Sequence, residues 1–388
     1  MLPSEAAKQQ LAALSSLSPP LQAQVATLTR AFVSNGVAAS FTKLVEGPVV
    51  LTFYFQPLGY AQLSKLYARQ EDIALSLGVE SVLIARELGL ITVQVPRAQR
   101  EIVAFDSCLH DMMTSTATAD MILPLLMGVS PQGEKIYADL SSQPHLLIAG
   151  ATNSGKSIFT AQVICSLALF RSPEEMDFVL VDTKNLDLVL FKSLEHVKQI
   201  VTSAEDLVFV LSELLEEVRK RNEMMSGFAR NIREWNAFQE NYWNPSRRDL
   251  ISSNKLKYKV LIIDEFADVI MQDSSGMVLK LVKQLAQISR AAGVHLIVAT
   301  QRPSVKIIDG DIKTNLPARI CFKLPSMTDS RVVLDENGAE NLLGMGDYLY
   351  KIAGSDTVRR AHSAFVSTTT IATIIAQNEM IRRQYARR

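Results

Sequence analysis

Charge of one sign, cysteine and long hydrophobic runs are all scarce in this sequence. Its 388 residues carry 40 Lys and Arg against 40 Asp and Glu, so no net charge attracts nucleic acid, a membrane surface or an acidic substrate. Any such partner has to be bound by a local group of charges. With 48% hydrophobic and 21% charged residues, the composition also excludes a mainly disordered or fibrous chain.

The few cysteines lie far apart, without the spacing of metal ligands. Cys165 and Cys321 fall within apolar runs, and we expect them and Cys108 to be buried reduced thiols rather than redox groups. No apolar run reaches the roughly 18 residues of a membrane span, and Met1 is not followed by a secretory signal pattern. The sequence therefore predicts a soluble, cytoplasmic protein without direct membrane insertion.

The chain is too long for one ordinary core, and at roughly 150 residues per domain it predicts two or three units. Residues 1–46 are rich in Ala, Leu, Ser and Gln, with leucines at helical spacing, and are predicted to form a helical N-terminal segment. Residues 47–107 combine strand-like and helical patterns, which indicates a small α+β subdomain. Residues 108–123 lack clear periodicity and are predicted to be a linker.

Residues 124–366 alternate longer amphipathic segments with short apolar strands, namely HLLIA, FVLVD, VLIID, HLIVA, ARICF and YLYKI. This alternation predicts an α/β fold with a largely parallel sheet covered on both faces. In such sheets ligands bind at the carboxyl ends of the strands. Residues 367–388 are predicted to form a C-terminal helix with a basic end, which is typical of a solvated terminus.

The most specific motif is GATNSGKS at residues 150–157, which follows the strand HLLIA and opens a helical run. It matches the Walker A pattern, GxxxxGKS, in the strand-loop-helix context that this motif requires. Its glycines let backbone N–H groups face phosphate oxygens, and the helix dipole favours the same negative charge. Lys156 is predicted to neutralise the β- and γ-phosphates of ATP, and Ser157 to bind Mg²⁺. The predicted nucleotide-binding residues are Gly150, Ala151, Thr152, Asn153, Ser154, Gly155, Lys156, Ser157 and Ile158.

A second motif lies where the apolar residues 260–263 run directly into Asp264 and Glu265. A buried strand that ends in a carboxylate is what magnesium coordination beside a P-loop needs, so Asp264 is predicted to bind the metal. Glu265 is the predicted base, because a second acid at this point can polarise the attacking water. After the next strand, Gln301 is the candidate that orients water and senses hydrolysis. Arg302 beside it is predicted to neutralise phosphate or to face a partner.

Besides these motifs, four segments resemble the motor of the FtsK/SpoIIIE DNA-translocase ATPases, within the HerA-FtsK group of RecA-like motors. They are DEFADVIM at 264–271, RAAGVHLIVATQRPSV at 290–305, DIKTNLPARICF at 311–322 and DSRVVLDENGAENLLGMGDYLY at 329–350. GPVVLTFYFQP and DIALSLGVESV are similar to the α subdomain that precedes the motor in that family. The resemblance implies a RecA-like P-loop NTPase core that uses ATP and Mg²⁺, preceded by a small α+β subdomain.

The resemblance also implies a homo-oligomeric ring, a hexamer, that pumps double-stranded DNA through a central pore. An arginine of one subunit then stabilises the transition state in the next, and Arg290 is the first candidate and Arg331 the second. Lys306 and Lys313 lie where the family has pore loops, which track phosphates, and together with Arg302 they are the predicted DNA-binding residues. A ring multiplies a few such contacts, which reconciles DNA binding with zero net charge. The turn at 344–347 resembles a family loop near the nucleotide.

Three features depart from the family pattern. A multi-span membrane region and room for a sequence-reading γ domain are both missing, so septal anchoring and sequence-directed movement are not expected without an accessory DNA-loading or membrane protein. In VDTKNLDL at 181–188, Thr183 stands where the family usually has Pro. Two other functions stay open: a protein-export ATPase, which shares the fold and the Walker residues, and an ATP-gated DNA clamp that does not travel.

Overall fold

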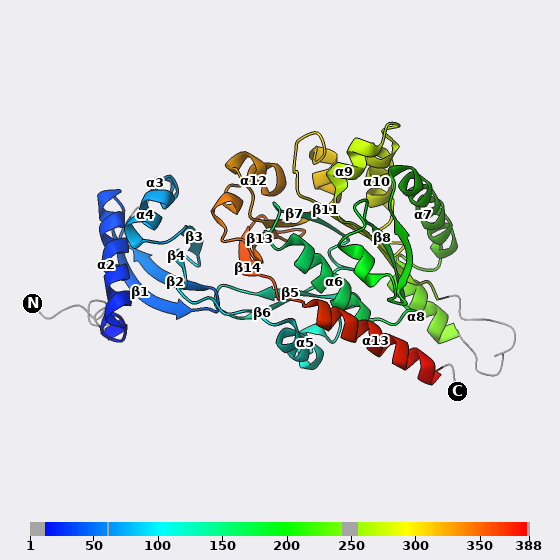
Figure 1. Ribbon diagram of the computed structural model, residues 1–388, viewed down its shortest axis with the longest axis horizontal. Coiled ribbons are helices and arrows are strands. Elements are labelled where there is room, and N and C mark those ends of the chain that lie inside the picture. The colour runs from blue at the N-terminus through cyan, green and yellow to red at the C-terminus, as the bar shows by residue number, and fades with distance from the viewer. Residues whose placement is uncertain (1–11, 60–61, 243–254, 386–388) are drawn as a thin grey trace, which may run out of the picture.

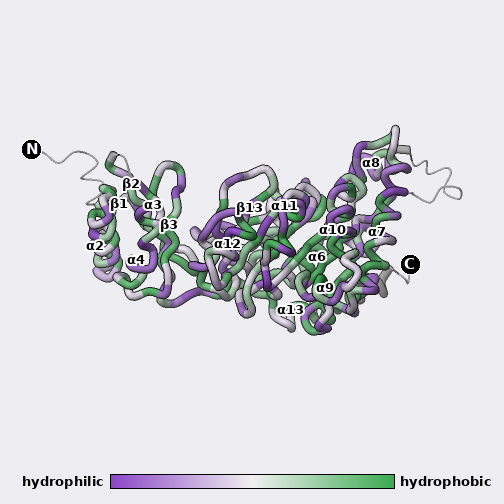
Figure 2. The backbone as a smooth tube through the Cα atoms, turned by 90° about the horizontal axis from the view of Figure 1, so that it is seen from above, coloured by the Kyte–Doolittle hydropathy of each residue, from purple (hydrophilic) through white to green (hydrophobic). Residues whose placement is uncertain are grey.

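The computed structural model describes residues 12–59, 62–242 and 255–385, in which the chain forms two β-sheets (Figure 1). The small sheet, near the N-terminus, has the strand order β1-β2-β4-β3. The large sheet has the order β6-β5-β14-β13-β12-β7-β11-β10-β8-β9. The elements of the small sheet lie at one end of the long axis of the molecule, and α7 and α8 lie at the other (Figure 2).

The small sheet is antiparallel throughout and is covered by helix α2 (Pro19–Ser34). Two prolines open this helix, where their fixed φ is compatible with the first turn. Leu28 and Phe32 are fully buried against the sheet, and Phe32 meets Phe55 edge-on with ring centroids 4.9 Å apart. The other elements of this unit are β1 (Ala39–Glu46), β2 (Val50–Pro57), α3 (Leu63–Tyr67), α4 (Gln70–Leu77), β3 (Leu83–Glu87) and β4 (Leu90–Pro96).

Strand β1 lies inside the segment that was expected to be helical. The helical prediction is correct for α2 but wrong for Ala39–Glu46, which pairs with β2 over its length. Ala39 and Phe41 are buried and the intervening Ser40 is less so, which is the period of two that a strand requires. The alternation covers only the first three residues of β1, because a bulge interrupts it after Phe41. So short a pattern is hard to recognise directly after a helical segment.

The large sheet is parallel in its central part and antiparallel towards one edge. Strands β12, β7, β11, β10, β8 and β9 pair in parallel, as the sequence predicts. The strand YLYKI, in contrast, belongs to an antiparallel series that runs from β12 through β13, β14 and β5 to β6. The strands are β5 (Pro124–Val129), β6 (Lys135–Asp139), β7 (His145–Ala149), β8 (Met176–Val181), β9 (Val197–Val201), β10 (Tyr258–Ile263), β11 (Val294–Thr300), β12 (Ala318–Phe322), β13 (Asp347–Lys351) and β14 (Arg359–His362).

Both faces of the central strands are covered by other parts of the chain. Every residue of β7, β8 and β11 is buried, and successive residues of a strand point to opposite faces. Helix α13 packs on α6, and α10 packs on α7 (Figure 1). The helices are α6 (Lys156–Phe170), α7 (Ala204–Met225), α8 (Ile232–Tyr242), α9 (Phe266–Gln272), α10 (Met277–Ile288), α11 (Gly310–Asn315), α12 (Met327–Leu334) and α13 (Thr368–Tyr385), with 3-10 turns at Thr116–Thr118, Leu188–Phe191 and Ala339–Asn341. Of the basic C-terminal end, Arg387 and Arg388 lie outside the described residues.

The segment predicted to be a linker holds most of a helix, α5 (Phe105–Thr114). Phe105, Cys108 and Met112 are buried at the spacing of one helix face, and they join the core of the large sheet. The predicted linker begins at residue 108, one turn inside α5, so it leaves out Phe105, the first buried residue of the pattern. A sequence window that begins at residue 105 includes all three buried residues and shows the helical periodicity.

The cysteine prediction is confirmed, since Cys108, Cys165 and Cys321 are all free and buried. Burial raises the pKa of Cys165 to about 12 and that of Cys321 well above its ordinary value, so both stay protonated at neutral pH. Among the helices in the described part of the chain, none combines the length and the apolar character of a membrane span.

Two histidines are buried side by side where β7 and β11 begin. His145 accepts a hydrogen bond from the N–H of Leu296 at its Nδ1 atom (3.1 Å), and His295 Nδ1 lies 3.0 Å from the carbonyl oxygen of Pro144. Burial lowers the pKa of His145 to about 3 and that of His295 to about 4. Both imidazoles are therefore neutral at physiological pH.

These histidines make the stability of the fold depend on pH. In the unfolded chain each binds a proton as the pH falls below about 6.5, whereas in the folded chain it does not until the pH approaches its lowered pKa. Stability is thus complete above about pH 6.5 and decreases below it, by about 2 kcal/mol per histidine at pH 5. Urea unfolding at pH 7.5 and pH 5 measures this loss. His295→Gln should reduce the loss, whereas His110→Gln, at an exposed position, should leave it unchanged; equal losses in all three proteins contradict the assignment.

Candidate active site

The loop at residues 150–155, which joins β7 to α6, carries the motif that the sequence singled out. Asn153 and Gly155 have positive φ values of 62° and 111°, and the loop curls through them into the first turn of α6. Within the described residues, the N–H groups of Lys156 and Ser157 meet no protein acceptor. They are the free donors that open a helix and suit an anion. All nine predicted nucleotide-binding residues lie in this loop and this first turn.

Lys156 links the loop to the end of strand β10. Its Nζ donates to the backbone oxygen of Asp264 (2.6 Å) and to Oδ1 of the same residue (2.9 Å), and both side chains are buried. Strand β11 separates β7 from β10 in the sheet, and all three end at the same edge because they are parallel. The two motifs predicted to cooperate are therefore in direct contact.

Glu265 is held at the end of strand β11 by both of its carboxylate oxygens. Oε1 accepts from the hydroxyl of Thr300 (2.7 Å), and Oε2 accepts from the N–H of Gln301 (2.8 Å). The side-chain oxygen of Gln301 in turn accepts from the hydroxyl of Thr152 (2.9 Å). The predicted base, the predicted sensor and the P-loop thus form one chain of hydrogen bonds.

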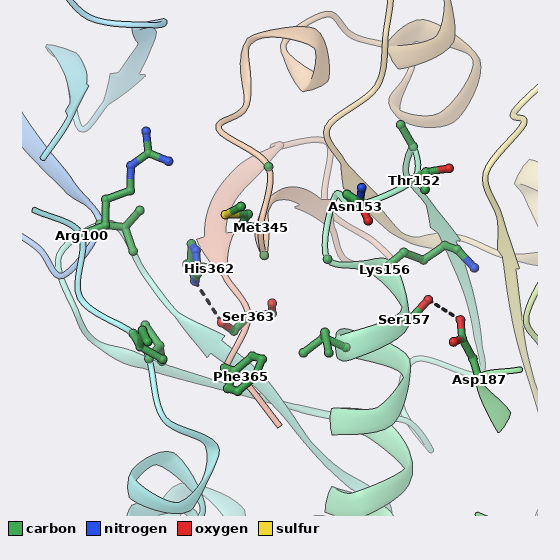
Figure 3. A pocket seen from close by; sticks show the side chains of 18 of the residues that line it. Arg100, Thr152, Asn153, Lys156, Ser157, Asp187, Met345, His362, Ser363 and Phe365 are labelled. Carbon is green, nitrogen blue, oxygen red and sulfur yellow. Dashed lines mark hydrogen bonds between the residues drawn. The ribbon is translucent and has the colours of Figure 1, made fainter. Parts of the chain in front are cut away.

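Sequence reasoning missed Asp187, whose Oδ2 accepts from the hydroxyl of Ser157 at 2.6 Å (Figure 3). The loop that carries Asp187 is folded around Asp182, a buried carboxylate at the end of β8. One oxygen of Asp182 accepts from the N–H groups of Leu186, Asp187 and Leu188 at 2.9–3.1 Å. A signal was available in the sequence, because the segment FVLVD ends in an acid, Asp182, as VLIID does before Glu265. Strand β8 lies beside β10 and ends at the same edge of the sheet, so the residues that follow Asp182 lie near the P-loop.

A cavity of about 850 Å³ opens beside the P-loop. The P-loop, Asp187 and Gln301 form its polar part. In Figure 3, Asp187 lies to one side of the loop, and Met345 and Phe365 lie to the other. Together with Ile102 they make that second part apolar, and all three are more than half exposed. The cavity therefore has the mixture that a nucleotide requires: donors and charge for phosphates, and apolar side chains for a base.

The turn at 344–347, expected near the nucleotide, packs directly on the P-loop. The N–H of Gly346 donates to the backbone oxygen of Ser154 (2.8 Å). A Cβ atom on Gly155 would lie 2.4 Å from the nitrogen of Gly346, so no other residue fits at position 155 without moving the turn. His362, beside the turn, has a pKa that burial lowers, so a neutral imidazole lines the cavity here.

The two arginines predicted to act as a finger do not line this chain's own cavity. Arg290 follows the end of α10 and is close enough to the histidines at the start of β7 and β11 to act on their charge. That is the opposite edge of the sheet from the P-loop. Arg331, on α12, is exposed and donates through Nε to Oδ1 of Asn337 (2.7 Å).

The three residues predicted to contact DNA have different surroundings. Arg302 and Lys306 are exposed in the loop that follows β11. Lys313 lies on α11, and its Nζ is 2.6 Å from Oδ1 of Asp335, so its charge is already paired within the chain. Arg302 follows Gln301 directly, which places this loop next to the hydrogen-bond chain of Glu265.

The described residues contain no cluster of three or more His, Cys, Asp or Glu side chains that would hold a metal ion alone. The donors near the P-loop are oxygens: the hydroxyl of Ser157, the carboxylate of Asp187 and, beyond Lys156, the carboxylate of Asp264. Mg²⁺ prefers oxygen ligands and commonly takes one or two carboxylates together with substrate phosphates and water. The residues therefore fit a magnesium ion that is bound jointly with a nucleotide.

Comparison with known proteins gives two family matches. Residues 110–305 match the model of the FtsK/SpoIIIE family, and residues 6–97 match that of the FtsK alpha domain. The chain is 35% identical to the DNA translocase FtsK of Oceanobacillus iheyensis over 92% of this chain and 45% of the relative. It is 34% identical to the DNA translocase SpoIIIE of Bacillus subtilis, over 90% of this chain and 44% of the relative. The chain thus spans about half the length of these curated relatives.

Solved structures support the same fold. The pCW3 conjugation coupling protein TcpA superposes with a TM-score of 0.61 at 21% identity, over 92% of this chain and 99% of that protein. The cytoplasmic domain of the type VII secretion ATPase EccC of Thermomonospora curvata gives a TM-score of 0.57 at 24% identity, over 66% of this chain and 31% of that protein. The family model covers half of the sequence and includes both Walker motifs, so the chain belongs to the FtsK/SpoIIIE family of P-loop ATPases.

Proposed function

We propose that this chain hydrolyses ATP with Mg²⁺ and uses the energy to move double-stranded DNA through a ring of identical subunits, six in number. The observation that carries the proposal is the hydrogen-bond chain from Thr152 of the P-loop through Gln301 to Glu265. It ties the phosphate-binding loop to the candidate base and to the loop that bears Arg302 and Lys306. The relatives' names, DNA translocase FtsK and SpoIIIE, support DNA as the moved substrate.

The chain's own residues divide the work of hydrolysis between them. Lys156 and the free N–H groups at the start of α6 bind the β- and γ-phosphates, and Lys156 exchanges its contact with Asp264 for phosphate oxygens. Glu265 takes the proton of the attacking water; its oxygens already accept two hydrogen bonds but keep lone pairs for a third. Gln301 holds that water in line.

Ser157, Asp264 and Asp187 are the residues that would hold magnesium beside the phosphates. When bound, the ion supplies positive charge to the phosphate oxygens. Asp187 adds to the two ligands predicted from the sequence, because its carboxylate already bonds the hydroxyl of Ser157. The base of the nucleotide then has the apolar wall of Ile102, Met345 and Phe365 to pack against.

In the proposed ring, an arginine of a neighbouring subunit supplies a further positive charge to the phosphates. Arg290 and Arg331 both lie away from this chain's own cavity, so either can reach a phosphate only in another copy. Arg302 and Lys306 are the exposed cations that follow the sensor, and we assign them to DNA phosphates. Lys313 would have to leave Asp335 to join them, which makes it the weakest of the three contacts.

Glu265→Gln separates the binding of ATP from its hydrolysis. Because the amide keeps the shape of the side chain but cannot take a proton, ATP should still bind while hydrolysis slows at least about a hundredfold. Lys156→Ala should instead lose nucleotide affinity. Equilibrium binding of a fluorescent ATP analogue and steady-state phosphate release measure the two effects, and unchanged phosphate release by Glu265→Gln removes it as the base.

Hydrolysis should be stimulated strongly by long linear double-stranded DNA and less by single-stranded DNA, and the stimulation should fade as salt is raised. The double variant Arg302→Ala, Lys306→Ala should weaken DNA binding and reduce the salt slope by about one for each contact removed. Lys220→Ala, an exposed site on α7, is the matched control. Hydrolysis indifferent to nucleic acid favours protein export instead, and DNA binding without movement in a triplex-displacement assay favours a clamp.

Arg290→Ala tests the sharing of the site between subunits. It should abolish hydrolysis but leave ATP binding nearly intact, because the arginine lies outside this chain's own cavity. Mixing it with Lys156→Ala protein should restore part of the activity, since some interfaces then combine an intact P-loop with an intact arginine. If no mixture recovers activity, Arg331→Ala is tested in the same way, and failure of both leaves the shared site without support.

A further inference from the structure

A buried ion pair lies where the small sheet meets the large one. Arg360 of β14 donates through Nε to Oδ1 of Asp347 (2.8 Å) and through Nη2 to Oδ2 (2.7 Å), and neither side chain is more than 4% exposed. A buried guanidinium and carboxylate in this two-bond arrangement hold each other in one orientation. Asp347 is therefore fixed in place at the start of β13.

Asp347 also holds the turn beside the P-loop through two hydrogen bonds. Its Oδ2 also accepts from the N–H of Leu343 (2.7 Å), and its own N–H donates to the oxygen of Gly344 (3.2 Å). These bonds close the turn from both sides. Within this turn, the N–H of Gly346 donates to the backbone oxygen of Ser154 in the P-loop (2.8 Å).

The third bond of Arg360 reaches the small sheet. Its Nη1 donates to Oε1 of Gln94 on β4 (3.0 Å), and Gln94 is buried. A second contact joins the same two units without touching Arg360, because the hydroxyl of Ser81 donates to the backbone oxygen of Asn341 (2.8 Å). The small sheet is thus connected to the turn beside the P-loop through Arg360. Other hydrogen bonds hold it without passing through Arg360, among them those of Ser81 with Asn341 and of Gln132 with Tyr54.

We propose that Gln94, Arg360 and Asp347 are positioning residues that couple the placement of the small sheet to the conformation of the P-loop. The proposal rests on the proposed function, in that the P-loop binds ATP. A small sheet that moves relative to β14 withdraws an acceptor from Arg360, loosens Asp347 and releases Gly346 from Ser154. By linkage, nucleotide binding stabilises the docked position of the small sheet to the same extent.

The test uses Gln94→Leu in the full chain, because removing either charge of the buried pair leaves the other unpaired and endangers folding. Gln94→Leu removes the acceptor and should weaken binding of a fluorescent ATP analogue at least about fivefold. Gln94→Glu keeps an acceptor and should retain the affinity of the unaltered protein. Ser81→Ala removes the neighbouring contact between the same units and should leave affinity unchanged.

Hydrogen exchange distinguishes positioning from a general loss of stability. In Gln94→Leu the amides of Leu343 and Gly346 should exchange faster, while those of the central strand β11 should not change; in Ser81→Ala none of them should change. Equal affinity in Gln94→Leu and the unaltered protein overturns the coupling, as does equal weakening in Gln94→Leu and Ser81→Ala. Absent nucleotide binding by the unaltered protein overturns both proposals, whereas binding without DNA-stimulated hydrolysis contradicts the proposed function alone.

Discussion

The contact between Lys156 and Asp264 sets the requirement that the rest of the site has to meet. Both groups are buried, and a charge taken out of water is tolerated when an opposite charge and further hydrogen bonds accompany it. Lys156 opens the helix that follows β7, Asp264 follows β10, and β11 lies between these two strands, so β7, β11 and β10 must be in register and end together. The parallel strands, of which β7, β8 and β11 are buried at every residue, supply that alignment. The Glu265 chain and the Asp187 loop occupy the same edge because of it.

The sequence was most informative where function depends on residues that are close together in the chain. GATNSGKS specifies its own loop and helix start, and the apolar run before Asp264 specifies a strand that ends in an acid. Asp187 was missed because its partner Ser157 lies 30 residues earlier in the chain, so only the fold brings the two side chains together. The antiparallel edge of the large sheet was missed for a similar reason, since the partner of a strand is decided by distant segments.

The sequence alone also does not show which basic residues are paired within the chain. Position in a loop made Lys306 and Lys313 equal candidates for a DNA contact, yet Lys313 meets Asp335, which lies far along the chain. Net charge gives no help here, because it cannot tell a cation that is paired within the chain from one that is free for phosphate. For DNA binding the number of cations without a partner inside the chain matters, and that number depends on tertiary pairing.

A Cβ atom on Gly155 would lie 2.4 Å from the nitrogen of Gly346, and one on Gly346 would lie 2.6 Å from the hydroxyl oxygen of Ser363. Gly155 belongs to the P-loop and Gly346 to the turn at 344–347, and the backbones of these two segments are in direct contact through the hydrogen bond from Gly346 to Ser154. A side chain at position 155 therefore displaces the turn, whereas one at position 346 displaces Ser363 and His362 behind the turn. The close packing at Gly155 therefore makes the P-loop depend on the turn, and transplanting the P-loop into a related chain should succeed only when the turn is transplanted as well.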